Sequence, residues 1–129
     1  MGPARVDRLV GVYDADGTPM GELRDWVGAR LGRAHCALCD ITHGLVRERA
    51  DWRACRATLP VEFATYHRDD QPDAVRAATG DRAPVVVAET DGGVVVLLDG
   101  AALDACAGSP ERLIAAVSDA LAAHDLTLD

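Results

Sequence analysis

Residues 83–98 read APVVVAETDGGVVVLL, and this stretch decides the fold expected of the chain. Two β-branched runs, at 85–89 and 94–98, flank the segment Thr90-Asp91-Gly92-Gly93, a composition typical of a hairpin turn. Pro84 stands directly before the first run, where a strand tolerates the missing backbone donor. The stretch therefore predicts two antiparallel strands that begin at an X-Pro bond.

Apolar spacing and turn residues define the elements expected on either side of this hairpin. They predict strands at 8–13 and 61–67, and helices at 20–31, 47–59, 73–79, 101–106 and from Pro110 onward. Gly80 is expected to close one helix, and Ser109 to cap the last one. Residues 32–46 are punctuated by glycine and predict a loop. The order is β-α-α-β-α-β-β-α in a single domain, residues 1–129.

The composition is that of an ordinary globular domain. The chain has 129 residues, of which 49% are hydrophobic and 26% charged, and this length buries a core without disulfides. No apolar run approaches the ~20 residues that cross a bilayer. Residues 1–8 lack the apolar core of a signal peptide. We therefore expect a cytoplasmic protein with no membrane partner.

The charge balance narrows the possible partners and mechanisms. The formal net charge is −8, which disfavours binding to nucleic acid or to anionic membranes. All 13 basic residues are arginine. The absence of lysine excludes Walker A phosphate binding, Schiff-base catalysis and kinase chemistry.

Cys36-Ala37-Leu38-Cys39 is the motif that most directly suggests chemistry. Two thiols three residues apart can close a small disulfide or bind one soft metal ion. In a cytoplasmic protein such a pair is more often catalytic or metal-binding than structural. His35 and Arg33 lie close by in the sequence, and a nearby cation lowers the pKa of a thiol.

His43 extends this motif to a possible metal site. Cys36, Cys39 and His43 together offer sulfur and nitrogen ligands suited to zinc or another soft transition metal. His35 is interpreted as a thiolate stabiliser, because adjacent residues on regular backbone point apart. The alternative is that His43 caps a turn before Gly44 and binds nothing.

The other cysteines and histidines carry weaker signals. Cys55 and Cys106 share apolar helical spacing with their neighbours, so both are expected to be small core residues. His67 and His124 are expected to be structural or solvated. The charged residues around the cysteine loop, which include Arg49 and Asp51, predict a solvated face.

A βαβ half followed by a ββα half that begins at Ala83-Pro84 resembles the thioredoxin-like superfamily. The resemblance implies an α/β three-layer sandwich with a central mixed sheet of about four strands. It also implies that the Ala83–Pro84 bond is cis and that Pro84 faces Cys36 and Cys39. The helix expected at 20–31, before the Cys-x-x-Cys loop, is an addition to that pattern. Tyr13–Asp16 and Cys36–Cys39 also resemble segments of small bacterial proteins.

Under this resemblance the protein is a thiol-disulfide oxidoreductase or a soft-metal-binding protein. In the redox version Cys36 attacks a disulfide, Cys39 resolves the mixed disulfide, and Pro84 lines the groove for a protein or small thiol/disulfide substrate. In the metal version the loop binds one ion. A third version is a non-catalytic interaction domain on the same scaffold.

Asp14-Ala15-Asp16-Gly17-Thr18 supports a competing hypothesis. After an apolar strand it resembles the first motif of haloacid-dehalogenase-like phosphatases, which implies Asp14 as nucleophile, Asp16 as general acid/base and a bridging magnesium ion. That family also needs a later lysine, occasionally arginine, and a later acidic pair, for which Asp69-Asp70 is the only tandem candidate. The alternative is a turn in which both aspartates cap the following helix.

Overall fold

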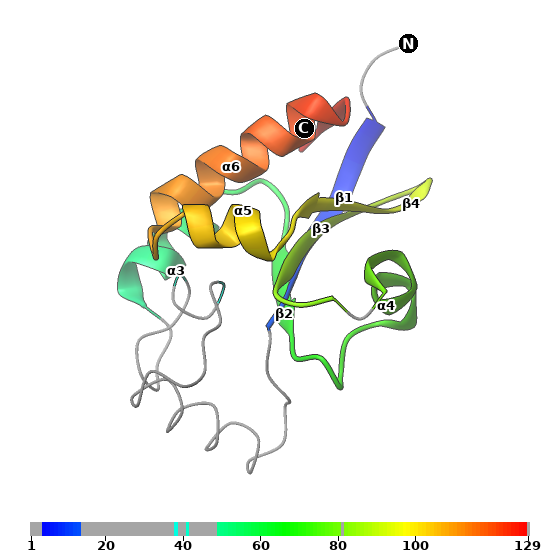
Figure 1. Cartoon of the computed structure of the whole chain (residues 1–129). Helices are drawn as coiled ribbons and strands as arrows, with labels where there is room; N and C mark the ends of the chain where they lie inside the picture. The colour runs from blue at the N-terminus through cyan, green and yellow to red at the C-terminus, as the bar shows by residue number, and fades with distance from the viewer. Residues whose placement is uncertain (1–3, 14–37, 39–40, 42–48, 81, 129) are drawn as a thin grey trace.

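The computed structural model describes residues 4–13, 38, 41, 49–80 and 82–128 (Figure 1). Within these residues the chain forms five strands and four helices. In chain order they are β1 (Ala4–Val12), α3 (Ala50–Ala57), β2 (Phe63–Tyr66), α4 (Asp73–Thr79), β3 (Val85–Thr90), β4 (Gly93–Leu98), α5 (Gly100–Ala105), α6 (Pro110–Ala123) and β5 (Leu126–Thr127).

The strands form one mixed, open sheet in the order β2-β1-β3-β4. β1 runs parallel to β2 and antiparallel to β3, and β3 forms an antiparallel hairpin with β4. β5 pairs in parallel with the beginning of β1. The expected α/β class with a mixed sheet is therefore confirmed, and the sheet has one strand more than the sequence predicted.

The hairpin forms where the sequence predicted it. Thr90 pairs with Gly93 at its tip, and the Thr90 hydroxyl accepts a hydrogen bond from the Gly92 amide at 3.1 Å. Gly93 has a φ of 128°, a conformation that glycine adopts without a steric penalty. At the other end of β3, the Ala83–Pro84 peptide bond is cis, as the resemblance implied.

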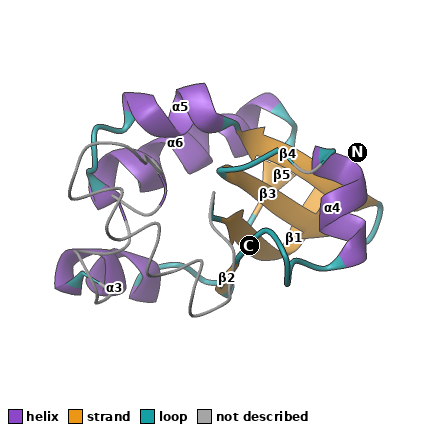
Figure 2. Ribbon diagram, turned by 60° about the horizontal axis from the view of Figure 1, so that its bottom comes forward, coloured by secondary structure: helices purple, strands orange, loops and turns teal. Residues whose placement is uncertain are grey.

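Helices pack on both faces of the sheet (Figures 1 and 2). One face carries the larger core, to which α3 contributes Trp52, α5 contributes Leu103, and α6 contributes Leu113. The opposite face carries a smaller core of five buried valines, and Val75 of α4 is its helical member. Burial on both faces explains why residues 9–12 of β1 and 85–88 of β3 carry no polar side chain.

A bulge in β1 decides which face each of its side chains joins. Val6 pairs with Thr90 and Arg8 pairs with Glu89, so Asp7 is the extra residue. Such an insertion shifts the alternation of side chains by one. Val6 therefore joins the larger core together with Leu9.

A polar cluster lies on the smaller-core side of the sheet. The Arg8 guanidinium forms an ion pair with Glu89, and its Nη1 donates to the Tyr66 hydroxyl at 3.0 Å. The Arg8 Cζ lies 5.6 Å from the centroid of the Tyr66 ring, within cation–π range. The cluster links β1, β2 and β3.

Local capping signals give the expected helix boundaries. The Ser109 side chain accepts from the Arg112 amide at the start of α6, and Gly80 ends α4 in the left-handed conformation at φ 64°. Other boundaries differ from the expectation: β1 begins at Ala4, α3 ends at Ala57, and β2 covers only Phe63–Tyr66. β5, which follows α6, was not predicted. The helix expected at 20–31 lies outside the described residues.

The side chains of Leu38 and Phe63 pack closely against the backbone of Gly11 in β1, on the larger-core face. A Cβ atom on Gly11 would lie 2.9 Å from Leu38 Cδ2 and 3.1 Å from Phe63 Cε1. Both neighbours are buried, and the exposed fraction of Leu38 is 0%. Glycine is therefore required at this position because no other residue leaves room for Leu38.

We predict that Gly11→Ala lowers the free energy of unfolding by about 1–3 kcal/mol, the usual cost of overpacking a filled core. Urea unfolding followed by circular dichroism measures it. Gly92→Ala is the matched control, because the nearest atom to a Cβ there is 3.7 Å away. Equal stability of the two variants would contradict the packing of Leu38 on Gly11.

Candidate functional site

Most residues that the sequence singled out for chemistry lie outside the described residues. This applies to the redox and metal candidates Cys36, Cys39 and His43, to His35, and to Asp14 and Asp16 of the phosphatase hypothesis. Pro84 is described, and so are Tyr13 and Leu38, which flank or interrupt these motifs in the sequence. The site is therefore built from the residues around the carboxyl end of β1.

Three neighbouring strands meet at this end of β1. Val12 pairs with Tyr66 of β2 on one side and with Val85 of β3 on the other. Tyr13 directly follows β1, His67 directly follows β2, and Pro84 directly precedes β3. Tyr13, His67 and Pro84 thus lie at the same end of three neighbouring strands, the carboxyl end of β1.

His67 is held in place at this edge by two neighbours. Its amide donates to Asp70 Oδ1 at 2.6 Å, and its Nδ1 lies 3.7 Å from Asp70 Oδ2. Its ring lies 5.6 Å from the Tyr13 ring, tilted by 55°. His67 is half-buried, and its role in shaping the turn after β2 agrees with the structural interpretation of this residue.

Leu38 fixes the middle of the Cys36–Cys39 motif to the sheet. It belongs to the same core cluster as Tyr13, Ile41 and Phe63, and it packs on Gly11. Gly11 and Tyr13 are two residues apart on β1, so they share a face of the sheet. Leu38 therefore packs on β1 two residues before Tyr13, close to the strand end where Tyr13 and His67 lie.

Pro84 packs against the start of α5. A Cβ atom on Gly100 would lie 3.8 Å from Pro84 Cδ, and Pro84 itself is half-buried. Ala83 packs on the opposite face, against the smaller core. The Ala83-Pro84 segment thus sits between the two helical layers, with part of Pro84 accessible to solvent.

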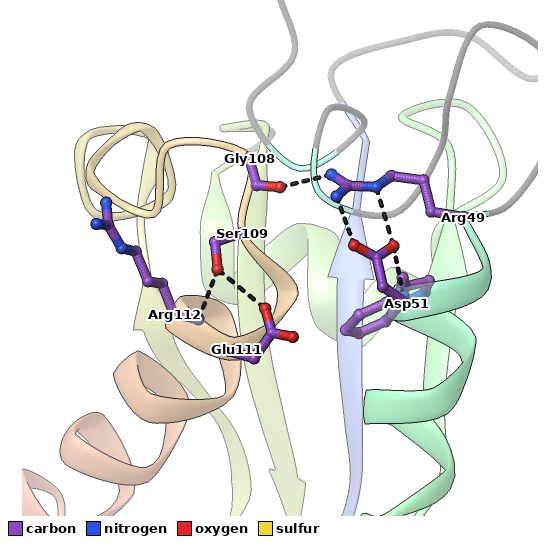
Figure 3. A network of polar contacts seen from close by, with 7 residues as sticks. Arg49, Asp51, Gly108, Ser109, Glu111 and Arg112 are labelled. Atoms are coloured by element: carbon purple, nitrogen blue, oxygen red, sulfur yellow. Dashed lines mark hydrogen bonds and ion pairs between the residues drawn. The ribbon is translucent and has the colours of Figure 1, made fainter.

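Arg49 anchors the chain where it enters α3 (Figure 3). Its Nε and Nη2 donate to the Asp51 carboxylate at 3.0 and 2.6 Å, the bidentate geometry that arginine favours. Its Nη1 donates to the Gly108 carbonyl at 2.5 Å. Arg49 and Asp51 are partly solvated, as expected, with side-chain exposed fractions of 30% and 44%. The network also joins the start of α3 to the turn before α6, a structural role that the sequence did not predict.

The sequence held only a partial signal for this network. Arg49 and Asp51 stand at the start of an amphipathic segment, where an acidic residue in the first turn is favourable. The third partner, Gly108, is 59 residues away from Arg49 in the chain. No local pattern indicates a contact at that separation.

The two described cysteines have different surroundings. Cys106 is buried, as expected, whereas Cys55 is only half-buried, so its assignment to the core is corrected. Burial raises the pKa of the Cys106 thiol, and the Arg112 charge partly opposes this. Burial also raises the pKa of the Cys55 thiol, and the carboxylates of Glu111 and Asp51 raise it further.

Within residues 4–13, 38, 41, 49–80 and 82–128, no three His, Cys, Asp or Glu side chains gather closely enough to hold a metal ion. None of the described helices is long and apolar enough to span a bilayer.

No protein-family model, curated protein or solved structure matches this chain. Evidence about its function therefore comes from its own residues.

We predict that Cys55 and Cys106 are the slowest cysteines to react with iodoacetamide at pH 7. A raised pKa keeps both thiols protonated there, and the thiolate is the reactive species. Their labelling accelerates as the pH rises into the alkaline range, and Cys36 is labelled first. Peptide mapping of partly alkylated protein measures the order.

The control is the same reaction in concentrated urea, where unfolding removes the difference in burial. Preferential labelling of Cys55 or Cys106 in the folded, metal-free protein would contradict the assignment of the reactive thiol to the Cys36–Cys39 pair.

Proposed function

We propose that this chain is a thioredoxin-like thiol-disulfide oxidoreductase that acts through Cys36 and Cys39. The observation that supports the proposal is the position of Leu38, the residue next to Cys39 in the sequence, which is buried against β1 near the strand end where Pro84 precedes β3. Leu38 and Pro84 are 46 residues apart in the sequence, and both lie near the carboxyl end of β1.

The arrangement of the strands supports the same assignment. β1 and β2 are parallel, and β3 and β4 form an antiparallel hairpin followed by a helix. These pairings support the βαβ half and the ββα half that the resemblance implies. α4 packs on one face of the sheet and α6 on the other, as in a three-layer sandwich.

The proposed reaction transfers two electrons from the protein to a disulfide. The Cys36 thiolate attacks one sulfur of the substrate disulfide, which forms a mixed disulfide and releases the other sulfur as a thiolate. The Cys39 thiolate then attacks the Cys36 sulfur. The products are the Cys36–Cys39 disulfide and a second substrate thiol, and a dithiol reductant regenerates the protein.

The edge of the sheet offers features suited to this chemistry. Pro84 is partly accessible beside the end of β1, so an extended substrate segment could lie against it. His67, whose ring packs on the buried Tyr13, provides polar surface at the same end of the strands. The substrate class is a protein or small-molecule disulfide.

We predict that mild oxidation by oxidised glutathione removes two of the four free thiols per chain without forming dimers. Reaction with a chromogenic disulfide before and after oxidation counts the thiols, and mass spectrometry checks for glutathione adducts. Cys36→Ser and Cys39→Ser each abolish the intramolecular loss. Cys55→Ser is the matched control, in which two thiols are still lost.

Elemental analysis of the reduced protein completes this experiment. Stoichiometric zinc or another soft metal, lost in Cys36→Ser and in His43→Ala, would replace the redox proposal with the metal-binding one. Four thiols that stay free and a metal-free protein would contradict both.

A separate measurement tests the phosphatase hypothesis. The antiparallel placement of β3 beside β1 differs from the parallel sheet which that family requires. We therefore expect Asp14→Asn to change stability modestly and to abolish no activity. Magnesium-dependent hydrolysis of a phosphate monoester by the wild type, lost in Asp14→Asn, would overturn the proposed function.

A further inference from the structure

β4 is the outermost strand on its side of the described sheet. Its six residues, Gly93–Leu98, include neither a charged residue nor a proline. Natural sheets usually protect an outer strand with such residues or with a bulge. The one irregularity in β4 lies opposite Val86 and Val87, near its carboxyl end. The segment from Gly93 to Val96 is regular and lacks these protective devices.

The register of the hairpin shows which backbone groups face outward. Thr90 and Gly93 close a two-residue loop, and such a pair is hydrogen-bonded on its inner side. The pairs that follow alternate between bonded and non-bonded. The N–H and C=O groups of Val94 and Val96 therefore point away from β3, toward the open edge.

The described helices cover both faces of the hairpin, and none of the described elements pairs with the outer edge of β4. Val94 and Val96 pack on the smaller core beside α4, and Leu97 packs on the larger core with α5 and α6. Figure 1 shows α4 on one side of β4 and the other two helices on the opposite side. A partner that uses the outward groups must therefore be an extended strand.

Two exposed carboxylates flank the edge and indicate the charge of that partner. Asp91 precedes β4 in the turn, and Asp99 follows it as the cap of α5. Both side chains are exposed, and the whole chain carries a net charge of −8. A second copy paired antiparallel about Val95 would set Asp91 against the other copy's Asp99, and this repulsion disfavours self-association.

We propose that the outer edge of β4 binds an extended segment of another protein, in which alternating apolar residues are flanked by arginine or lysine. The partner segment adds to the sheet as a further strand through main-chain hydrogen bonds to Val94 and Val96. Asp91 and Asp99 attract the basic residues at its two ends. This inference is independent of the cysteine chemistry.

The test uses two fluorescein-labelled peptides, Arg-Val-Thr-Val-Thr-Val-Arg and its glutamate-flanked analogue, with the wild-type protein. Fluorescence anisotropy at low salt is expected to show about tenfold tighter binding of the arginine-flanked peptide, because several exposed charge pairs change sign between the two. Added salt narrows this difference. Backbone N-methylation is placed either on the odd-numbered or on the even-numbered residues of the arginine-flanked peptide. Only one of these two peptides is expected to lose binding, because only every second N–H group faces β4.

A charge variant of the protein isolates the role of the aspartates. Asp91→Asn combined with Asp99→Asn removes both charges, and asparagine preserves the turn and the helix cap. In this variant the preference for arginine flanks is lost, while the matched control Asp119→Asn on α6 keeps it. Circular dichroism verifies that all variants are folded.

Three results would overturn the proposal. They are the absence of binding by either peptide, an unchanged preference after removal of the two aspartates, and a wild-type dimer that Val95→Lys dissociates. The last result would assign the edge to a second copy of the chain.

Discussion

β1 hydrogen-bonds to three other strands, and its residues 9–12 are buried on both faces of the sheet. β2 and β5 pair with its carboxyl and amino ends, and β3 pairs along most of its length. Leu9 contributes to the larger core and Val10 to the smaller one, and both are fully buried. A polar substitution at Leu9, Val10 or Val12 would leave an unsatisfied group in the interior, whichever face it joined. Every other element is positioned by contact with β1 or with a strand paired to it.

The two faces of the sheet are covered unequally. Among the described helices, three pack on the larger core, whereas α4, with seven residues, packs on the smaller one. Part of that second face is instead occupied by side chains, because Tyr66 and Glu89 gather around the Arg8 guanidinium. The arginine stem and the tyrosine ring exclude water from the strands beneath them while their polar atoms stay partly solvated. A short helix therefore suffices on this side.

The sequence predicted the residue types of the candidate site but not their positions relative to one another. Cys36-x-x-Cys39 and Pro84 are recognisable because the thiol spacing and the X-Pro bond are local features. The positions of Leu38 and Pro84 near one end of β1 depend on the pairing of β1 with β3 and on the burial of Leu38 against Gly11. The sequence also could not indicate that Arg49 binds the Gly108 carbonyl, because that contact exists only once α3 and α6 have packed together.

The sequence by itself determined the hairpin at 85–98, the helix from Asp73 to Gly80 and the cap at Ser109, since turn geometry and capping depend on residues close together in the chain. Tertiary structure alone decided the bulge at Asp7, the pairing of Leu126–Thr127 with β1 and the half-exposure of Cys55. A two-residue strand has no detectable period of its own and forms only because a neighbour offers unpaired backbone groups. Burial of a thiol likewise depends on which distant helix covers it, and no local pattern records that contact.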